Sequence, residues 1–529
     1  SGRAPEEPRH HSLMRSLPGG RAAVAVAATA VAILSLLPFA YLFAAGISAE
    51  AITKLFSYPN TAALLARTIG ITLSTTLTAL VLGIFGAIIV VRTDVPGRKL
   101  LTVLLTAPLA VPLFVNAYAG YSASLVFAPG TEIVTSFTGA TAIIALVLYP
   151  YVFLACVIAL RNVDPAQEEV ARSLRSRPLA VFWRVTLPQL RTALASSGLI
   201  VALHVLSEYG AMMQTRQRTL TTRIMSEMLD FGDYDSARSL SVLLAVIAMA
   251  VIGLGRLVSG RETPLSVSSQ TTRMPVRIRL GSARIPLLLL TLAIPTAALS
   301  PTVFMTVRGL LSPHRHLAVN WSNVLASATT TFSYAAWAGL IATVCALPVS
   351  WWVTRHPSLR SNLAERSVWL AHSIPNAILA LALVFLAIHL VPDFYKTAPL
   401  LVLAYVILYL PLAVTNQNVG LQGAMVKYDE AAASLGASSF GRFRRVTFPI
   451  ALPGIATGAL LVGLDASKEL TTSLMLMPFN TQTLATGLWS TTAGETLDFT
   501  AAAPYSAMLL ILGAVPVYLI VHRTLRFIP

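Results

Sequence analysis

The chain has 529 residues, of which 55% are hydrophobic and only 11% are charged, and its mean hydropathy is +0.72. A soluble protein of this length carries roughly twice that charged fraction, so an array of soluble domains is excluded. The formal net charge of +16 would suit nucleic-acid binding. An excess of Lys and Arg on the cytoplasmic side of a membrane protein explains it more simply, and no nucleic-acid partner is expected.

Apolar runs of about 20 residues recur from end to end, which is the length that a helix needs to cross a bilayer. Because backbone in lipid must satisfy its own hydrogen bonds, they predict an all-α polytopic membrane protein with about 12 transmembrane helices. The spans predicted for the first half are 22–47, 63–91, 101–127, 139–160, 191–214 and 238–257. Those of the second half are 285–307, 325–354, 367–391, 398–418, 453–477 and 503–522.

The remaining segments divide the chain into two homologous six-helix halves, 22–257 and 285–529. A basic tail, 1–21, precedes the first half, and a linker rich in Ser, Thr, Arg and Pro, 258–284, joins the two. Loops on the side of the N-terminus hold about three to four times as many Lys and Arg as the opposite loops. Both termini and the linker are therefore expected in the cytoplasm.

Two polar, basic islands repeat along the chain without a gap, at an offset of 261 residues. The first reads Glu-Val-Ala-Arg-Ser-Leu-Arg from Glu169 and Phe-Trp-Arg-Val-Thr-Leu-Pro from Phe182. The second reads Glu-Ala-Ala-Ala-Ser-Leu-Gly from Glu430 and Phe-Arg-Arg-Val-Thr-Phe-Pro from Phe443. Contact with lipid headgroups does not demand a repeated motif. The repeat therefore favours two equivalent docking surfaces for a symmetric partner.

The second island predicts two short helices. Glu430 suits the positive N-terminal end of a helix dipole, and Ala431 and Ala432 extend the helix. Gly436 offers a left-handed stop. A second short helix then carries Phe443 beside basic residues and is expected to lie parallel to the membrane, with an exposed apolar surface that requires a partner.

Glu-Ala-Ala followed by Gly and by a helix that ends in Leu-Pro or Phe-Pro resembles the EAA loop of ATP-binding-cassette importer permeases. The first copy departs from this pattern, with Val170 in place of one Ala and Arg175 at the glycine position. The resemblance implies the type I importer permease fold, with EAA loops at 164–188 and 429–449 that dock as coupling helices on two ATPase subunits. The residues implied in coupling are Glu169, Ala171, Arg175, Phe182, Pro188, Glu430, Ala431, Ala432, Gly436, Phe443 and Pro449.

The chain is most similar to permeases of iron(III) uptake systems, which fuse both halves into one polypeptide. Ser-Glu-Tyr-Gly from Ser207 and Lys-Glu-Leu from Lys468 carry part of that resemblance. Thiamine, phosphonate and polyamine permeases are similar in layout and stay open as alternatives. The resemblance implies a bacterial cytoplasmic (inner) membrane, surrounding membrane lipid and an extracytoplasmic solute-binding protein as partner.

No Gly-x-x-x-x-Gly-Lys-Ser/Thr sequence occurs in the chain. This loop cradles the phosphates of ATP in P-loop enzymes, so the chain is not expected to bind ATP in that manner or to be an enzyme. We expect no cofactor on this chain, and ATP-Mg on the separate partner subunits.

Ionisable side chains within the predicted spans are costly in lipid and are therefore functional candidates. Glu208 and Glu469 are related by the same offset of 261 residues. His204 lies one turn before Glu208, and Asp465 one turn before Glu469, so each pair is expected on one helix face. Lys468 is close enough in sequence to pair with Asp465. Two interpretations stay open: these side chains line the translocation path or its gate, or they hold the helices together.

Carboxylate oxygens suit a hard trivalent cation, so Glu208 and Glu469 are candidates for transient contact with iron. No high-affinity metal site is expected, because a deep binding well would stop release. Three acids of one outer loop, Asp230, Asp233 and Asp235, are interpreted as solvated loop residues in preference to a cation site.

A different class of transporter also fits twelve spans in two parallel halves. In a proton-driven secondary transporter, Glu208, Glu469, His204 and Asp465 would carry protons. The presence or absence of a partner ATPase separates the two classes.

Overall fold

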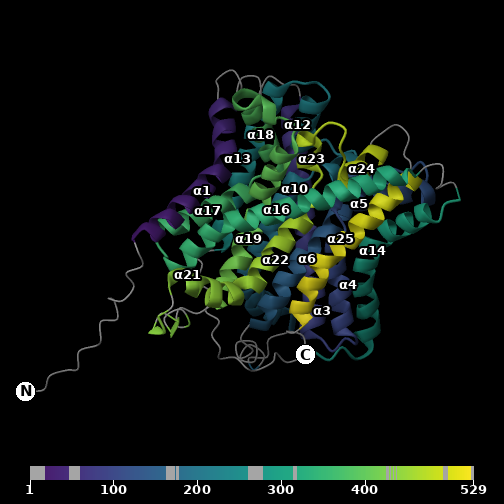
Figure 1. The fold of residues 1–529 in the computed structure, drawn as a ribbon. Helices are drawn as coiled ribbons and strands as arrows, with labels where there is room; N and C mark the ends of the chain where they lie inside the picture. The colour runs from purple at the N-terminus through teal and green to yellow at the C-terminus, as the bar shows by residue number, and fades with distance from the viewer. Residues whose placement is uncertain are drawn as a thin grey trace, which may run out of the picture. The chain divides into compact units, whose positions relative to one another are not determined.

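The computed structural model describes residues 18–46, 60–162, 173, 178–259, 278–313, 319–423, 428, 431–432, 434–436, 438–492 and 499–525. Within these residues the regular structure is helical (Figure 1), apart from an isolated bridge between Thr93 and Ile278. The basic tail before residue 18 and most of the predicted linker lie outside the described residues.

The helices of the first half are α1 (Pro18–Gly46), α3 (Thr61–Arg92), α4 (Arg98–Thr106), η1 (Ala107–Ala110), α5 (Leu113–Phe127), α6 (Phe137–Asn162), α8 (Pro178–Val181), η2 (Phe182–Thr186), α9 (Leu187–Gln189), α10 (Arg191–Ser207), α11 (Gly210–Gln214), α12 (Leu220–Leu229) and α13 (Tyr234–Ser259). Those that follow are η3 (Gly281–Ala283), α14 (Arg284–Leu310), α16 (Trp321–Arg355), α17 (Leu359–Ser373), α18 (Asn376–Leu390), η4 (Pro392–Phe394), α19 (Ala398–Gly423), α21 (Ser439–Arg442), η5 (Phe443–Thr447), α22 (Phe448–Ala466), α23 (Thr471–Leu476), α24 (Leu484–Thr492) and α25 (Phe499–Leu525).

Among the described residues, nine helices are long and apolar enough to cross a membrane, or up to twelve if each of three bent pairs is one span. The pairs are Arg98–Ala110 with Leu113–Phe127 (93°), Phe182–Gln189 with Arg191–Ser207 (62°), and Leu359–Ser373 with Asn376–Leu390 (102°). These twelve candidates correspond one to one with the predicted spans. The all-α polytopic fold is therefore confirmed.

Two sharp bends occupy matching places in the halves and have the same cause. Pro112 precedes α5 and Pro375 precedes α18, each with a polyproline-like backbone. Proline provides no backbone N–H and disfavours the helical conformation in the residue before it, so a helix breaks there.

Two predicted spans end earlier than expected. The prediction 191–214 is wrong at its end, because α10 stops at Ser207, and 453–477 is wrong likewise, because α22 stops at Ala466. A short helix, α11 or α23, follows each stop. Hydropathy detects no break here because the residues on both sides are mostly apolar.

Contacts between Cα atoms group the chain into two compact units. Unit 1 comprises Ser1–Pro38, Ala336–His372 and Tyr405–Gly463, and unit 2 comprises Phe39–Ala335, Ser373–Ala404 and Leu464–Pro529. The division into halves at 22–257 and 285–529 stays a prediction, since these units follow spatial contacts and draw on both halves.

Glycine permits close helix crossings in both units. In unit 2, α3 meets α6 at Gly83, where an added Cβ would lie 2.5 Å from Val152 Cβ. In unit 1, an added Cβ on Gly454 of α22 would lie 2.5 Å from the carbonyl oxygen of Asn416 on α19. Small residues at such crossings let helix backbones approach closely, which drives helix association in lipid.

The first long helix of the second half packs on helices of the first half within unit 2. α14 contacts α4, α5 and α6, and also lies beside α25 (Figure 1). The hydroxyl of Thr302 on α14 donates a buried hydrogen bond of 2.8 Å to Asn116 Oδ1 on α5. This helix of the second half is therefore packed among helices of the first half.

Candidate coupling and translocation site

The structure describes only part of each repeated island. Glu169, Ala171, Arg175 and Glu430 lie outside the described residues. Gly436 has a φ of 82°, so the predicted left-handed stop is confirmed. An L-residue pays a steric cost in that conformation that glycine avoids.

Each island continues into one π-helical turn at the same place in the repeat. The turns are Phe182–Thr186 (η2) and Phe443–Thr447 (η5). Their final threonines are both buried, and the arginines before them are exposed. π-Turns are rare and frequently occur at functional positions. The two islands therefore share an unusual backbone geometry as well as a sequence pattern.

The two islands then differ in how they join the next span. After the first, the helix axis bends by 62° between Phe182–Gln189 and Arg191–Ser207. After the second, Phe443–Ala466 is one continuous span, and Pro449 lies in the first turn of its α22 part. The expectation of a separate short helix in the second island is therefore wrong, whereas the first island does end in a separate short helix, near Pro188.

Aromatic contacts connect the second island to a neighbouring helix of unit 1. The ring of Phe443 meets Trp351 of α16 edge-on at 5.5 Å between centroids. The guanidinium of Arg355 lies 5.4 Å from the centroid of the same indole. In the first island, Phe182 instead contacts its neighbour Trp183, which is 60% exposed. The second island is therefore packed against α16 as well as joined to α22.

Glu208 and Glu469 occupy equivalent breaks in the helices of unit 2. The Glu208 carboxylate accepts the backbone N–H of Ala211 at 2.8 Å, and that of Glu469 accepts the backbone N–H of Thr472 at 2.9 Å. Each glutamate thus caps the short helix that follows it, α11 or α23, where the helix dipole favours a negative charge.

The two breaks lie against each other. An added Cβ on Gly210 would lie 2.7 Å from Leu470 Cδ2 and 2.6 Å from Phe114 Cβ. The rings of Tyr209 and Trp489 are 5.3 Å apart, and the carboxylates of Glu208 and Glu469 are near enough for their charges to interact. The structure therefore brings together the two acids that the repeat singled out.

The two carboxylates differ in the number of hydrogen bonds that they accept from side chains. Glu469 also accepts the Thr472 hydroxyl at 3.0 Å and Asn376 Nδ2 at 3.0 Å. Among the described residues no side chain donates a hydrogen bond to Glu208. Leu113 begins α5 as Asn376 begins α18, so the first half has an apolar residue where the second has the amide.

The flanking charges are only partly as predicted. Lys468 Nζ lies 3.2 Å from Asp465 Oδ1, which confirms that pair. The expectation that each pair shares a helix face is wrong: α10 ends at Ser207, before Glu208, and α22 ends at Ala466, before Glu469. His204 Nδ1 lies 3.0 Å from the carbonyl oxygen of Ile200, and its ring is 5.1 Å from Tyr151.

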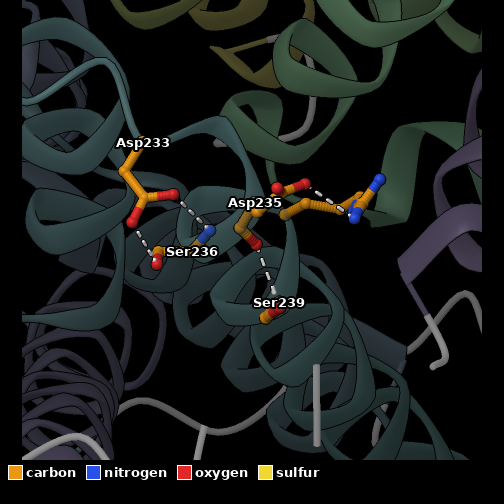
Figure 2. Close-up of polar contacts among 5 residues, drawn as sticks. Asp233, Asp235, Ser236 and Ser239 are labelled. Carbon is orange, nitrogen blue, oxygen red and sulfur yellow. Dashed lines mark hydrogen bonds and ion pairs between the residues drawn. The ribbon is translucent and has the colours of Figure 1, made fainter. Parts of the chain in front are cut away.

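Two of the three acids at 230–235, Asp233 and Asp235, have structural partners at the start of α13 (Figure 2). The Asp233 carboxylate accepts the backbone N–H of Ser236 at 3.0 Å and its hydroxyl at 2.6 Å. Asp235 pairs with Arg238 at 2.8 Å. These contacts fit the interpretation as ordinary loop and capping residues.

Sequence comparison supplies the class of protein. The family of binding-protein-dependent transport system inner membrane components matches residues 79–258 and 339–527, so its domain is present twice. This chain belongs to that family. It is the permease component of an ATP-binding-cassette transporter, a multi-pass protein of the inner membrane, and is not itself the ATPase.

This permease is similar to relatives named for different cargoes. It is 31% identical over 490 residues to "Fe(3+)-transport system permease protein FbpB 2" of Haemophilus influenzae, which covers 92% of this chain and 95% of that protein. It is 28% identical to "Sulfate permease 2, chloroplastic" of Chlamydomonas reinhardtii, over 43% of this chain and 66% of that protein. It is 29% identical to "Molybdenum transport system permease protein ModB" of Mycobacterium tuberculosis, over 38% and 81%.

Membership in the family implies ATPase and solute-binding-protein partners. It also favours ATP-driven import over the proton-driven alternative. Within the described residues of the permease, no group of three or more His, Cys, Asp or Glu side chains is arranged to hold a metal ion.

Two hydrogen bonds that anchor short helices of the permease on long ones were not predicted from the sequence. The backbone N–H of Leu220 donates to Thr68 Oγ1 at 3.0 Å, and that of Leu484 donates to Thr331 Oγ1 at 2.8 Å. These bonds fix the starts of α12 and α24 on the second span of each half. The threonine-rich beginnings of 63–91 and 325–354 are the signal that could have revealed them.

Proposed function

We propose that this permease imports iron(III), with its termini and both islands in the cytoplasm. The observation that carries the proposal is the similarity over 92% of the chain to a permease named for Fe(3+) transport, in which both halves are likewise matched. The sulfate and molybdenum permeases match less than half of this chain. The basic loops on the side of the islands support the orientation.

The paired glutamates favour a cation over an oxyanion as cargo. At about 4 Å and an effective dielectric constant of about 20, a divalent oxyanion would meet repulsion of about 8 kcal/mol from one carboxylate, whereas a cation would be attracted. Carboxylate oxygen is also the ligand type that hard cations prefer. In this proposal Glu208 and Glu469 line the path or its gate, while His204, Asp465 and Lys468 flank it.

The islands transmit the movement of two partner ATPase subunits, one bound at each. The helix Phe443–Ala466 ends three residues before Glu469, and Arg191–Ser207 ends at the residue before Glu208. A 24-residue helix is about 36 Å long, so a rotation at the island moves its far end by several ångströms. Each island would thereby be coupled mechanically to one glutamate.

The decisive experiment is reconstitution in liposomes with the cognate ATPase and solute-binding protein. We expect radioactive iron(III) to accumulate only when ATP and both partners are present. Sulfate, molybdate, thiamine, a polyamine and a phosphonate serve as competing cargoes. Uptake of one of them without iron uptake would contradict the cargo, and uptake by the chain alone in a proton gradient would contradict ATP coupling.

A further inference from the structure

The short loop between α11 and α12 presents two arginines to solvent. Burial alternates along it: Thr215, Gln217 and Thr219 are at most 3% exposed, whereas Arg216 and Arg218 between them are exposed. Three polar side chains therefore point into the protein, and the two cations point out. Neither arginine forms an ion pair within the part of the chain that the structure describes.

Buried hydrogen bonds hold this loop in one conformation. The side-chain amide of Gln217 donates to the carbonyl oxygen of Thr135 at 2.7 Å, and its oxygen accepts a hydrogen bond of 2.7 Å from the Arg67 guanidinium. The hydroxyls of Thr219 and Thr222 each accept the backbone N–H of the other, at 3.4 and 2.8 Å. The two arginines are therefore held in place before any partner binds, which lowers the entropic cost of association.

Arg216 keeps a backbone conformation that is unfavourable for arginine. Its φ is 55°, and Asn480 of the second half has a φ of 57°. The two positions match, because each lies four residues before the anchored leucine of its half, Leu220 or Leu484. Asparagine tolerates this left-handed conformation, whereas arginine rarely adopts it. Such outliers tend to occur at functional positions.

A neighbouring tyrosine fixes the direction of this side chain. The Arg216 guanidinium donates a hydrogen bond of 2.9 Å to the Tyr121 hydroxyl and lies 5.5 Å from the centroid of its ring. This bond uses one of five N–H donors and leaves the positive charge without a negative partner. The guanidinium is therefore oriented without being neutralised.

The matching loop of the second half has a different surface. Residues 477–483 include no charged side chain, and Phe479 among them is 74% exposed. The ammonium of Lys396 lies 4.5 Å from the centroid of that ring and is only partly exposed. The pair of exposed arginines thus belongs to the loop of the first half alone.

We propose that Arg216 and Arg218 bind an acidic patch of the extracytoplasmic solute-binding protein and so fix the orientation in which it docks. The inference rests on the proposed function, whose orientation places this loop outside the cell. Guanidinium groups pair well with carboxylates. Because only one of the two matching loops carries them, such a patch would dock on the first half and not on the second. The same arginines would repel a cationic cargo, so they suit the partner better than the cargo.

The test is association of the iron-free cognate solute-binding protein with the full chain and its ATPase in phosphatidylcholine nanodiscs, followed by surface plasmon resonance. For Arg216→Gln with Arg218→Gln we expect the association rate constant to fall about threefold for each arginine, and so about tenfold, at low salt. In about 1 M salt the difference should disappear, because the Debye length is then about 3 Å. The matched control is Arg308→Gln, at an exposed arginine of α14, which should associate as the wild type does.

Arg216→Asn separates docking from folding. It copies the second half, and so removes the guanidinium and relieves the unfavourable backbone together. We expect a melting temperature at least as high as that of the wild type, with association about threefold slower. A lower melting temperature with unchanged association would show that Arg216 is structural and would overturn the proposal.

Three other results would also overturn it. Wild-type association by the double variant would remove its basis. A loss seen in phosphatidylglycerol nanodiscs and absent in phosphatidylcholine would assign the arginines to lipid headgroups. A loss seen only with the iron-loaded binding protein would assign them to the cargo.

A labelling experiment separates this inference from the proposed orientation. Arg218→Cys is treated with a membrane-impermeant maleimide in spheroplasts, beside the wild type, whose Cys156 and Cys345 lie within α6 and α16. Labelling of the variant above the wild type supports the outer location of the loop. Absence of labelling would overturn the orientation and this inference together, whereas labelling with unchanged association by the double variant would overturn this inference alone.

Discussion

The side-chain amide of Asn376 donates a hydrogen bond of 3.0 Å to Glu469, and Glu208, the equivalent acid, receives no such bond from the leucine at the matching position. A repeated acid thus sits in two different environments. Glu469 accepts hydrogen bonds from two side chains as well as from the backbone, and Glu208 keeps more of its acceptor capacity.

Asn376→Leu, which copies the first half, should lower the free energy of unfolding by about 2 kcal/mol, because a hydrogen bond to a charged acceptor is lost from a buried carboxylate. Chemical unfolding in detergent measures this. Leu113→Met, at the matching position, is the control and should change it by less than about 1 kcal/mol. Equal stability of Asn376→Leu and wild type would show that the bond contributes nothing.

Glu208→Gln should lower iron uptake more than it lowers stability, because among the described residues only backbone N–H groups, and no side chain, donate to this carboxylate. The expected loss in uptake is about tenfold, equivalent to about 1.4 kcal/mol in the barrier. Uptake in liposomes and unfolding in detergent are compared on the same preparation. A loss of assembly with the ATPase would instead support a purely structural role.

Thr331→Val and Thr68→Val should each destabilise the protein by about 1–3 kcal/mol, since each leaves a buried backbone N–H, of Leu484 or Leu220, without its acceptor. The substitutions nearly preserve volume. Thr329→Val is the matched control, because the Thr329 hydroxyl is exposed and bonds only within its own helix. An equal effect of all three would mean that helix propensity, and not the anchor, is responsible.

Gly210→Ala should impair packing between the two breaks, because its Cβ would lie 2.6 Å from Phe114 Cβ. Overpacking of this kind costs about 1–3 kcal/mol. Gly253→Ala on α13 is the control: its Cβ would meet nothing within 4 Å, and alanine favours helix by up to about 1 kcal/mol. Thermal unfolding of the two variants should therefore shift in opposite directions.

Glu169→Ala combined with Glu430→Ala should uncouple uptake from ATP hydrolysis while leaving the protein folded. The reason is that, under the proposed coupling role, both islands lose an acid that contacts the ATPase. ATP hydrolysis and iron uptake are measured together in liposomes, and Glu132→Ala, at an exposed position outside both islands, is the control. Wild-type uptake in the double variant would contradict the coupling role.

The sequence by itself determined the class and the repeat. Runs of apolar residues long enough to cross a bilayer permit only helices there, because the lipid offers the backbone no hydrogen-bonding partner. The offset of 261 residues related the islands and also paired Glu208 with Glu469. A glycine at position 436 was enough to predict a left-handed turn there, since few other residues tolerate that conformation.

Only the tertiary structure decided where the long helices break and what each charged group contacts. The stops at Ser207 and Ala466 lie within long, mostly apolar runs, and the few polar residues beside them do not by themselves mark a helix end. The bond from Asn376 to Glu469 joins residues 93 positions apart, and the anchor of Leu484 on Thr331 joins residues 153 apart. Such partners are set by helix packing, which depends on the whole chain, whereas spans and turns follow from solvent and local backbone preference.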